Sequence, residues 1–171
     1  RANLIAQLSA RYAPQGRPSV RGALVIFSRA NQCGSGARAG QMPNLTIREK
    51  SMMLEADHRY LRYALMVAER ARDHGDRPFG AVLVSSRGRI LIEAENRENL
   101  TQDCTGHAET RLLAQASRQF PRHLLVHCTL YVNAEPCPMC AGAIFWSGVG
   151  RVVYGLSNSR LRQLIGQPSE Q

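Results

Sequence analysis

The sequence predicts a layered α/β domain, with helices covering one mixed sheet, over roughly residues 54–166. The main observation is that helical and strand patterns alternate in this part of the chain, in the order α-β-β-α-β-α-β-α. A chain of 171 residues with 44% hydrophobic content is also long and apolar enough for one domain with a buried core. No apolar run is long enough to cross a membrane, so we expect no membrane partner.

The first 50 residues form a separate basic segment. They contain eight Lys and Arg against one acid, Glu49, which gives +7 (8 − 1) of the total charge of +9, and residues 51–171 carry the remaining +2 (9 − 7). Glycine and proline are frequent here, which favours a disordered tail or sequence upstream of the natural start. A transit-like or RNA-binding arm is the alternative, because the segment is rich in arginine. Residues 167–171 are expected to be a short tail.

The first helix of the domain is expected from about Leu54 to His74. Apolar residues recur at helical spacing, acids occupy the first turns, basic residues occupy the last turn, and Gly75 follows as a stop signal. A hairpin comes next, in which strands at Ala81–Val84 and Ile90–Ala94 flank a turn rich in serine, glycine and arginine.

Helices and strands alternate through the rest of the domain. A helix is expected at His107–Gln119, a strand at Cys128–Val132, a helix at Cys137–Ser147, a strand at Arg151–Tyr154 and a short helix at Leu161–Ile165. A single sheet with helices packed over it is the usual arrangement for this order of elements.

Two motifs carry the chemistry, and together they have the pattern H-x-E followed by P-C-x-x-C. One imidazole and two thiolates give Zn²⁺ three protein ligands, which leaves the fourth tetrahedral position open for water, as in catalytic zinc sites. A carboxylate two residues from a ligand is placed to take a proton from that water and pass it to a leaving group. Glu109 is therefore the predicted catalytic residue. The predicted ligands of one zinc ion per chain are His107, Cys137 and Cys140.

Cys104 permits another interpretation of the same residues. It lies three positions before His107, so Cys104-x-x-His107 and the second cysteine pair could enclose a structural zinc ion with four ligands. The protein would then be a zinc-stabilised interaction module without enzymatic activity. A closed site gives no reason for an acid at Glu109, and this favours the catalytic interpretation.

With these motifs, residues 55–165 resemble the cytidine deaminase-like superfamily, in its branch of purine and nucleoside deaminases. The resemblance is carried by His107-Ala108-Glu109 and by Pro136-Cys137-Pro138-Met139-Cys140-Ala141-Gly142-Ala143. It implies a three-layer α/β/α fold with a mixed central sheet, a zinc-containing active site, and hydrolytic release of ammonia from the exocyclic amine of a nucleobase or nucleoside. It also implies that Asn96 hydrogen-bonds the base.

Two subfamilies within this group are similar to the chain. Pro78–Val82 and Ala143–Trp146 resemble bacterial guanine deaminases, and this resemblance implies that Phe79 and Trp146 contact the substrate ring. Arg151–Gly155 resembles the tRNA-specific adenosine deaminases, which also use basic surfaces that this domain largely lacks. We therefore expect a small-molecule, guanine-like base or nucleoside as substrate, with A-to-I deamination of tRNA as the alternative.

The relatives continue past the last helix with a further strand and one or two helices. The C-terminal part of the fold is therefore expected to be truncated, with the sheet edge uncovered or completed by a partner chain, and a homodimer is expected. The five cysteines do not suggest a disulfide framework. Free thiols at the positions outside the metal site indicate a reducing compartment, and we expect the cytoplasm.

Overall fold

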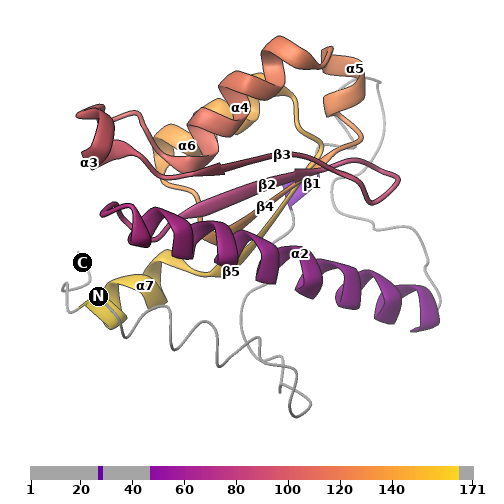
Figure 1. Ribbon diagram of the computed structural model, residues 1–171. Coiled ribbons are helices and arrows are strands. Elements are labelled where there is room, and N and C mark those ends of the chain that lie inside the picture. Colours follow the sequence, from indigo (N-terminus) through magenta and orange to yellow (C-terminus); the bar gives the residue numbers. More distant parts are fainter. Residues whose placement is uncertain (1–26, 29–46, 166–171) are drawn as a thin grey trace.

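The computed structural model describes residues 27–28 and 47–165 (Figure 1). Its centre is a five-stranded sheet with the strand order β1-β5-β4-β2-β3. Strands β4 and β5 are parallel, whereas the β1–β5, β2–β3 and β2–β4 pairs are antiparallel, so the predicted mixed sheet is confirmed. The strand bounds are β1 Phe27–Ser28, β2 Gly80–Val84, β3 Ile90–Glu95, β4 Thr129–Ala134 and β5 Arg151–Leu156.

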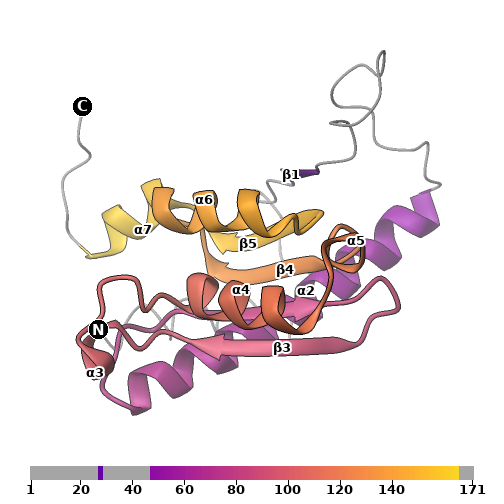
Figure 2. The ribbon, with the colours of Figure 1, turned by 90° about the horizontal axis from the view of Figure 1, so that it is seen from above.

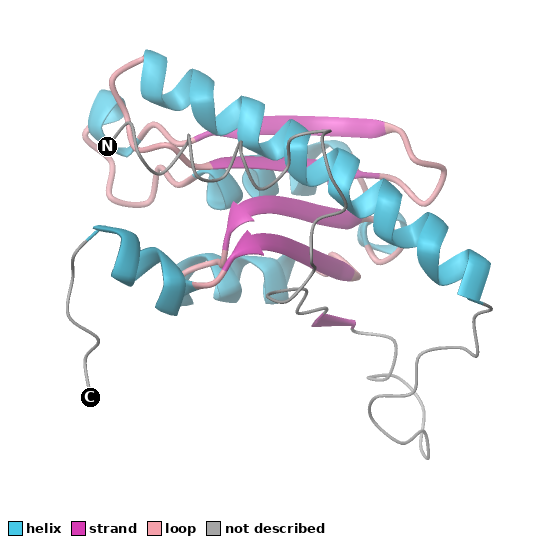
Figure 3. Ribbon diagram, turned by 90° about the horizontal axis from the view of Figure 1, so that it is seen from below, coloured by secondary structure: helices cyan, strands magenta, loops and turns pink. Residues whose placement is uncertain are grey.

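Helices cover both faces of this sheet, which confirms the three-layer α/β/α fold. Helices α2 and α7 lie on one face, and α4 and α6 lie on the other (Figures 1 and 3). Seen from above, α4 and α6 are side by side over the strands (Figure 2). No helix in the described ranges has an apolar stretch long enough to span a membrane. The helix bounds are α2 Ile47–Asp73, α3 Glu98–Thr101, α4 Ala108–Gln119, α5 Arg122–Leu125, α6 Pro138–Ser147 and α7 Asn158–Ile165.

Strand β2 shows why both faces of the sheet need a cover. Ala81 and Leu83 pack in the core beneath α4 and α6, whereas Val82 and Val84 pack beneath α2. All four side chains are buried. Successive side chains of a strand point to opposite faces, so an uninterrupted apolar run has low free energy only where helices cover both faces.

Helix α2 begins at Ile47, seven residues before the start expected at Leu54. The expectation rested on apolar periodicity, which marks only the residues of a helix that face a packed surface. Residues 47–53 instead include Arg, Glu, Lys and Met, which favour helical backbone by their intrinsic propensity. The helix therefore extends into the segment 1–50 that we predicted to be separate. Apart from residues 27–28 and 47–50, that segment lies outside the described residues.

Strands β4 and β5 each extend two residues beyond their expected ends, to Ala134 and Leu156. Asparagine is unfavourable in strands, so no local pattern indicates that β4 continues through Asn133. The structure buries this residue because its side chain is satisfied at both ends. Its Oδ1 accepts a hydrogen bond from the amide of Gly80 at 2.9 Å, and its Nδ2 donates to the carbonyl of Pro78 at 2.9 Å.

The outer edge of β5 carries the short strand β1. Phe27 lies opposite Val152, and Ser28 lies opposite Arg151. We expected this edge to be uncovered or completed by a partner chain. Over these two residue pairs, the chain itself completes it.

Gly80 lies where β2 meets α2 and has no room for a side chain. A Cβ atom at this position would lie 2.4 Å from the carbonyl oxygen of Ala64 and 2.5 Å from the amide nitrogen of Ala68. Both are backbone atoms of α2, which cannot rotate away as a side chain can. A larger residue would therefore force α2 away from the sheet.

We predict that Gly80→Ala lowers the free energy of unfolding by about 1–3 kcal/mol, the usual cost of overpacking a core. Gly142→Ala is the matched control, because a Cβ there would have no atom within 4 Å apart from the neighbouring backbone of its own helix. This control should leave the free energy of unfolding unchanged or raise it by up to about 1 kcal/mol, since alanine favours the helix. Urea unfolding followed by circular dichroism measures both variants. A wild-type midpoint for Gly80→Ala would contradict the prediction.

Candidate metal centre and active site

The three predicted metal ligands lie at the N-termini of two helices. His107 immediately precedes α4, Cys137 immediately precedes α6, and Cys140 lies in the first turn of α6. Pro138 occupies the first turn of α6, where a missing N–H disrupts no helical hydrogen bond. The sequence therefore starts each helix directly at a ligand, and the fold brings the two starts together.

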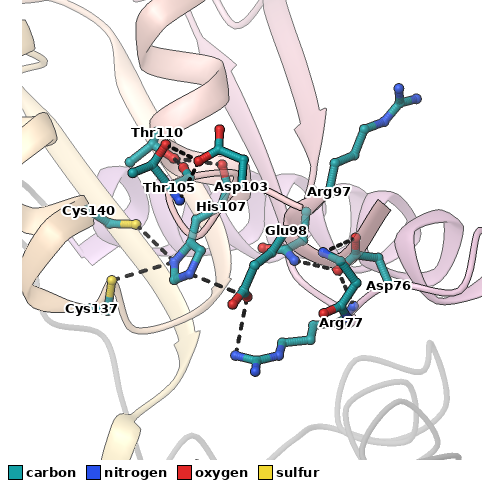
Figure 4. A network of polar contacts seen from close by, with 12 residues as sticks. Asp76, Arg77, Arg97, Glu98, Asp103, Thr105, His107, Thr110, Cys137 and Cys140 are labelled. Atoms are coloured by element: carbon teal, nitrogen blue, oxygen red, sulfur yellow. Dashed lines mark hydrogen bonds and ion pairs between the residues drawn. The ribbon is translucent and has the colours of Figure 1, made fainter. Parts of the chain in front are cut away.

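The ligand atoms have the spacing of a tetrahedral zinc site. The Nδ1 atom of His107 lies 3.6 Å from Sγ of Cys137 and 3.5 Å from Sγ of Cys140 (Figure 4). Bond lengths of about 2.3 Å to sulfur and about 2.05 Å to nitrogen, at a tetrahedral angle, place sulfur and nitrogen about 3.6 Å apart. The three residues present therefore fit zinc without rearrangement.

Cys104 does not join this group. It is exposed, and within the described part of the chain the cluster consists of His107, Cys137 and Cys140 with no fourth ligand. An ion held by three protein atoms keeps one position for water or substrate, which is the arrangement of a catalytic zinc site. The alternative of a closed site completed by Cys104 does not fit this geometry.

The Cys140 thiol shows why the site needs a cation. Burial, the neighbouring Glu109 carboxylate and Cys137 all raise the pKa of this thiol. The side chain is fully buried, so its thiolate has little solvation of its own. The partial positive charge of the α6 N-terminus favours the thiolate. A bound Zn²⁺ ion supplies the rest of the compensation, since metal ligands are deprotonated when they bind.

Glu109 lies in the first turn of α4 and is buried beside the metal ligands. Burial raises the pKa of its carboxyl group, and its own backbone N–H, His107 and Cys140 oppose that rise. The carboxyl group therefore lies next to the metal position in a low-dielectric environment that favours its protonated form. A group of this kind can both accept and donate a proton during one reaction.

Asn96 and Phe79 lie together at the end of the sheet where β3 ends and β2 begins. The amide of Asn96 donates to the carbonyl oxygen of Phe79 at 3.0 Å. The Asn96 side chain is buried, and its Nδ2 donates to Asp76 at 2.7 Å. Its Oδ1 has no hydrogen-bond partner among the described residues, although it too is buried. A buried acceptor in this state is available to a donor group on a ligand.

Trp146 occupies a different environment. Its side chain is 75% exposed and contacts Phe145 edge to face, with 5.2 Å between the ring centroids. It lies six residues after Cys140 on α6, about 9 Å further along the helix axis at 1.5 Å per residue. Trp146 is the single tryptophan of the chain, and a tryptophan usually packs in the core. Here its side chain lies outside the core. Its contact with substrate stays a prediction.

Sequence reasoning missed two acids that organise the site. Asp76 is buried and accepts hydrogen bonds from Asn96 and from the backbone amides of Arg77, Asn99 and Leu100. Burial alone would raise the pKa of Asp76, but these hydrogen bonds lower it below its usual value. Glu98, in α3, lies beside the ring of His107 (Figure 4). Asp76 lies in the connection between α2 and β2, and Glu98 begins a helix of one turn. In both places an acid normally indicates a solvated segment.

Comparison with known families identifies the domain. The family model for the cytidine and deoxycytidylate deaminase zinc-binding region matches residues 54–156. The chain belongs to this deaminase family. Zinc is therefore the metal that His107, Cys137 and Cys140 are positioned to bind.

The relatives of this chain are named for different substrates. A probable cytosine deaminase from Schizosaccharomyces pombe is 44% identical over 116 residues, which cover 68% of this chain and 70% of the relative. A tRNA-specific adenosine deaminase from Haemophilus influenzae is 41% identical over 104 residues, which cover 61% of this chain and 60% of the relative. The chain spans about three fifths of the second protein. The similarity therefore does not assign the substrate of that protein to this chain.

Solved structures agree with the fold. A guanine deaminase from Bacillus subtilis matches with a TM-score of 0.57 and 34% identity, over 64% of this chain and 69% of that chain. A guanine deaminase from Nitrosomonas europaea matches with a TM-score of 0.57 and 25% identity, over 77% and 83%. The predicted cytidine deaminase-like fold is thereby confirmed.

We predict that the purified protein contains one zinc ion per chain and that Cys140→Ser loses it, because two ligands cannot enclose the ion. Cys104→Ser is the matched control and should retain a full equivalent, since Cys104 is exposed and outside the cluster. Plasma mass spectrometry of dialysed protein measures the stoichiometry. Loss of zinc from the Cys104 variant would instead support the closed structural site, with Cys104 as the fourth ligand.

Proposed function

We propose that this zinc deaminase releases ammonia from the exocyclic amine of a guanine-like base or nucleoside. The observation that carries the proposal is the combination of a three-ligand metal site with a buried carboxyl group, Glu109, directly beside it. The first leaves a position for water, and the second provides for proton transfer. A structural zinc site requires neither feature.

The residues around the metal divide the reaction between them. Zinc, when bound, supplies an activated water molecule as nucleophile. Glu109 takes a proton from that water and delivers it to the departing amine. A C–O bond forms at the ring carbon, the exocyclic C–N bond breaks, and ammonia leaves. The Glu109 side chain is buried, so the proton that it carries between the two steps is shielded from bulk solvent.

The choice of a guanine-like ring rests on the residues at the end of the sheet. Oδ1 of Asn96 is a buried acceptor without a partner among the described residues, so it suits an N–H donor on the edge of a base. Asp76 fixes the orientation of this amide by accepting from its Nδ2. Phe79 lies beside Asn96, and we propose that it contacts the ring, with Trp146 as a second aromatic contact. The similarity to two guanine deaminases supports the same substrate.

A cleft beside β3 favours tRNA adenosine as the second candidate substrate. It has a volume of about 700 Å³, lies between α2 and α4, and is lined by four arginines. Arg70 and Arg97 form ion pairs with Glu93 and Glu95. Within residues 47–165, the other two arginines, at positions 111 and 118, form no ion pair with a carboxylate. Arg111 does donate a hydrogen bond to the backbone carbonyl of Glu95 at 2.6 Å. Guanidinium groups that no carboxylate neutralises can bind the phosphates of an RNA chain.

Two further expectations stay proposals, and the structure offers an observation in support of each. Large apolar side chains are exposed along α6, at Met139, Phe145 and Trp146, and such a patch suits the interface of a homodimer. The four cysteines in the described part of the chain form no disulfide, which supports a cytoplasmic location.

We predict that Glu109→Gln keeps its zinc and loses deaminase activity by at least about a hundredfold, because glutamine can neither accept nor release a proton. Glu55→Gln, a change of an exposed acid on α2, is the matched control and should retain activity. Ammonia release and zinc content are measured on the same samples. Wild-type turnover by the Glu109 variant would remove this residue from the mechanism.

We predict that the zinc-loaded protein releases ammonia from guanine faster than from cytosine, cytidine, adenosine or a tRNA anticodon stem-loop, and that a chelator abolishes the activity. Asn96→Ala should reduce turnover of guanine by about tenfold or more, the effect of losing one hydrogen bond worth about 1–3 kcal/mol. Turnover of the stem-loop alone would identify a tRNA deaminase. Retention of zinc without turnover of any substrate would favour the interaction module.

A further inference from the structure

The two nitrogens of the His107 ring face different partners. Nδ1 faces the sulfurs of Cys137 and Cys140 at 3.6 and 3.5 Å, whereas Nε2 lies 3.7 Å from Oε2 of Glu98. Figure 4 shows the ring between the two sulfurs on one side and the Glu98 carboxylate on the other. A neutral imidazole that binds a metal through Nδ1 carries its proton on Nε2. That proton points at Glu98.

The Glu98 carboxylate needs a donor of this kind. Its Oε2 atom is buried and has no hydrogen-bond partner among the described residues. A buried carboxylate oxygen without a hydrogen bond is costly in free energy. Two N–H groups lie near it, Nη1 of Arg77 at 3.3 Å and Nε2 of His107 at 3.7 Å. A movement of about 0.7 Å would bring Oε2 within hydrogen-bond distance of Nε2.

The backbone around Glu98 is fixed against the segment that carries His107. The amide of Arg97 donates to the carbonyl of Gly106 at 2.9 Å, and the amide of Asp103 donates to the carbonyl of Glu98 at 3.1 Å. A Cβ atom on Gly106 would lie 3.2 Å from the Cα and amide nitrogen of Glu98 and 2.9 Å from the carbonyl oxygen of Asp103. The turn before the histidine therefore packs directly on the backbone of Glu98.

Asp76 anchors the same helical turn from the other side. Its Oδ2 accepts hydrogen bonds from the amides of Asn99 and Leu100, at 3.0 Å each. A helix of one turn has little stability of its own, so these contacts hold α3 in position. The separation between the Glu98 carboxylate and the His107 ring is thus determined by a network of backbone contacts on both sides.

The ion pair with Arg77 offers a simpler role for Glu98. The Arg77 side chain is 58% exposed, however, and ion pairs with exposed groups contribute little to stability. An acid needed only for that pair would have no reason to place one oxygen out of solvent beside a metal ligand. The Arg77 contact and the His107 contact can be separated by substitution.

We propose that Glu98 is a positioning residue for the metal site, whose carboxylate accepts the Nε2 proton of His107 and holds the ring with Nδ1 toward the two cysteine sulfurs. Carboxylates that bind the outer nitrogen of a metal-binding histidine fix both its proton and its orientation. The contact is made within the protein and does not involve substrate. The proposal therefore depends on zinc binding at this site. It does not depend on which base is deaminated.

The release of zinc from the full chain to a chromophoric chelator tests the proposal. Glu98→Ala should release zinc about 10–100-fold faster than the wild type, the range for loss of such a partner. Glu98→Gln should fall between the two, because its amide oxygen still accepts the proton. Arg77→Met is the matched control, which removes the ion pair and leaves the His107 contact, and it should remain within about twofold of the wild type.

A wild-type release rate for Glu98→Ala would overturn the proposal, and so would equal acceleration by Arg77→Met, which would assign the effect to the ion pair. If Glu98→Ala does not fold, Glu98→Gln carries the test by proton NMR. The Nε2–H resonance of zinc-loaded His107 should lie at low field in the wild type and in Arg77→Met, and should move to higher field in Glu98→Gln. An unchanged resonance in Glu98→Gln would also overturn it.

Discussion

The site depends on two helix N-termini that meet over one end of the sheet. His107 and Cys137 each occupy the position just before a helix, so the backbone direction of α4 and α6 sets the direction of both ligands. The same two helices pack on a common core through Leu112, Ala143 and Ile144. The metal position is thus specified by apolar packing some distance away. A change that separates these helices would disturb the ligands without touching them.

Asp76 connects two parts of the site that have different tasks. One of its oxygens accepts from Asn96, whose amide we propose to bind the base, and the other holds α3, whose Glu98 lies against the metal histidine. Four hydrogen bonds to one buried carboxylate make a rigid joint, and they also keep it ionised at neutral pH. The side chain that we propose to bind the base and the acid beside the metal histidine therefore share one support in the loop between α2 and β2.

The sequence predicts those features that depend on residues close together along the chain. Helix and strand order, the three ligands and Glu109 follow from periodicity and from close spacing along the chain, and the structure brings these ligands together. Asp76 could not be predicted, because its burial depends on contacts with residues 20 or more positions away, such as Asn96. Glu98 could not be predicted, because it lies half-buried in a one-turn helix without periodicity. Asn133 was missed for a similar reason, since its partners at Pro78 and Gly80 lie more than 50 residues away. Trp146 shows a different limit: the helix that carries it was predicted to the correct last residue, but the 75% exposure of its side chain depends on which elements pack against α6, and no local pattern gives that.

The 30-residue separation (137 − 107) between the histidine and the first cysteine has a consequence for the life of the protein in the cell. An unfolded chain does not hold these ligands together, so the ion binds the native state far better than the denatured ensemble. Native-state binding of this kind is thermodynamically linked to folding, and each tenfold increase of free metal above the dissociation constant adds about 1.4 kcal/mol to the free energy of unfolding. Metal starvation would thus act on the abundance of the protein, through proteolysis of its denatured form, as well as on its catalysis.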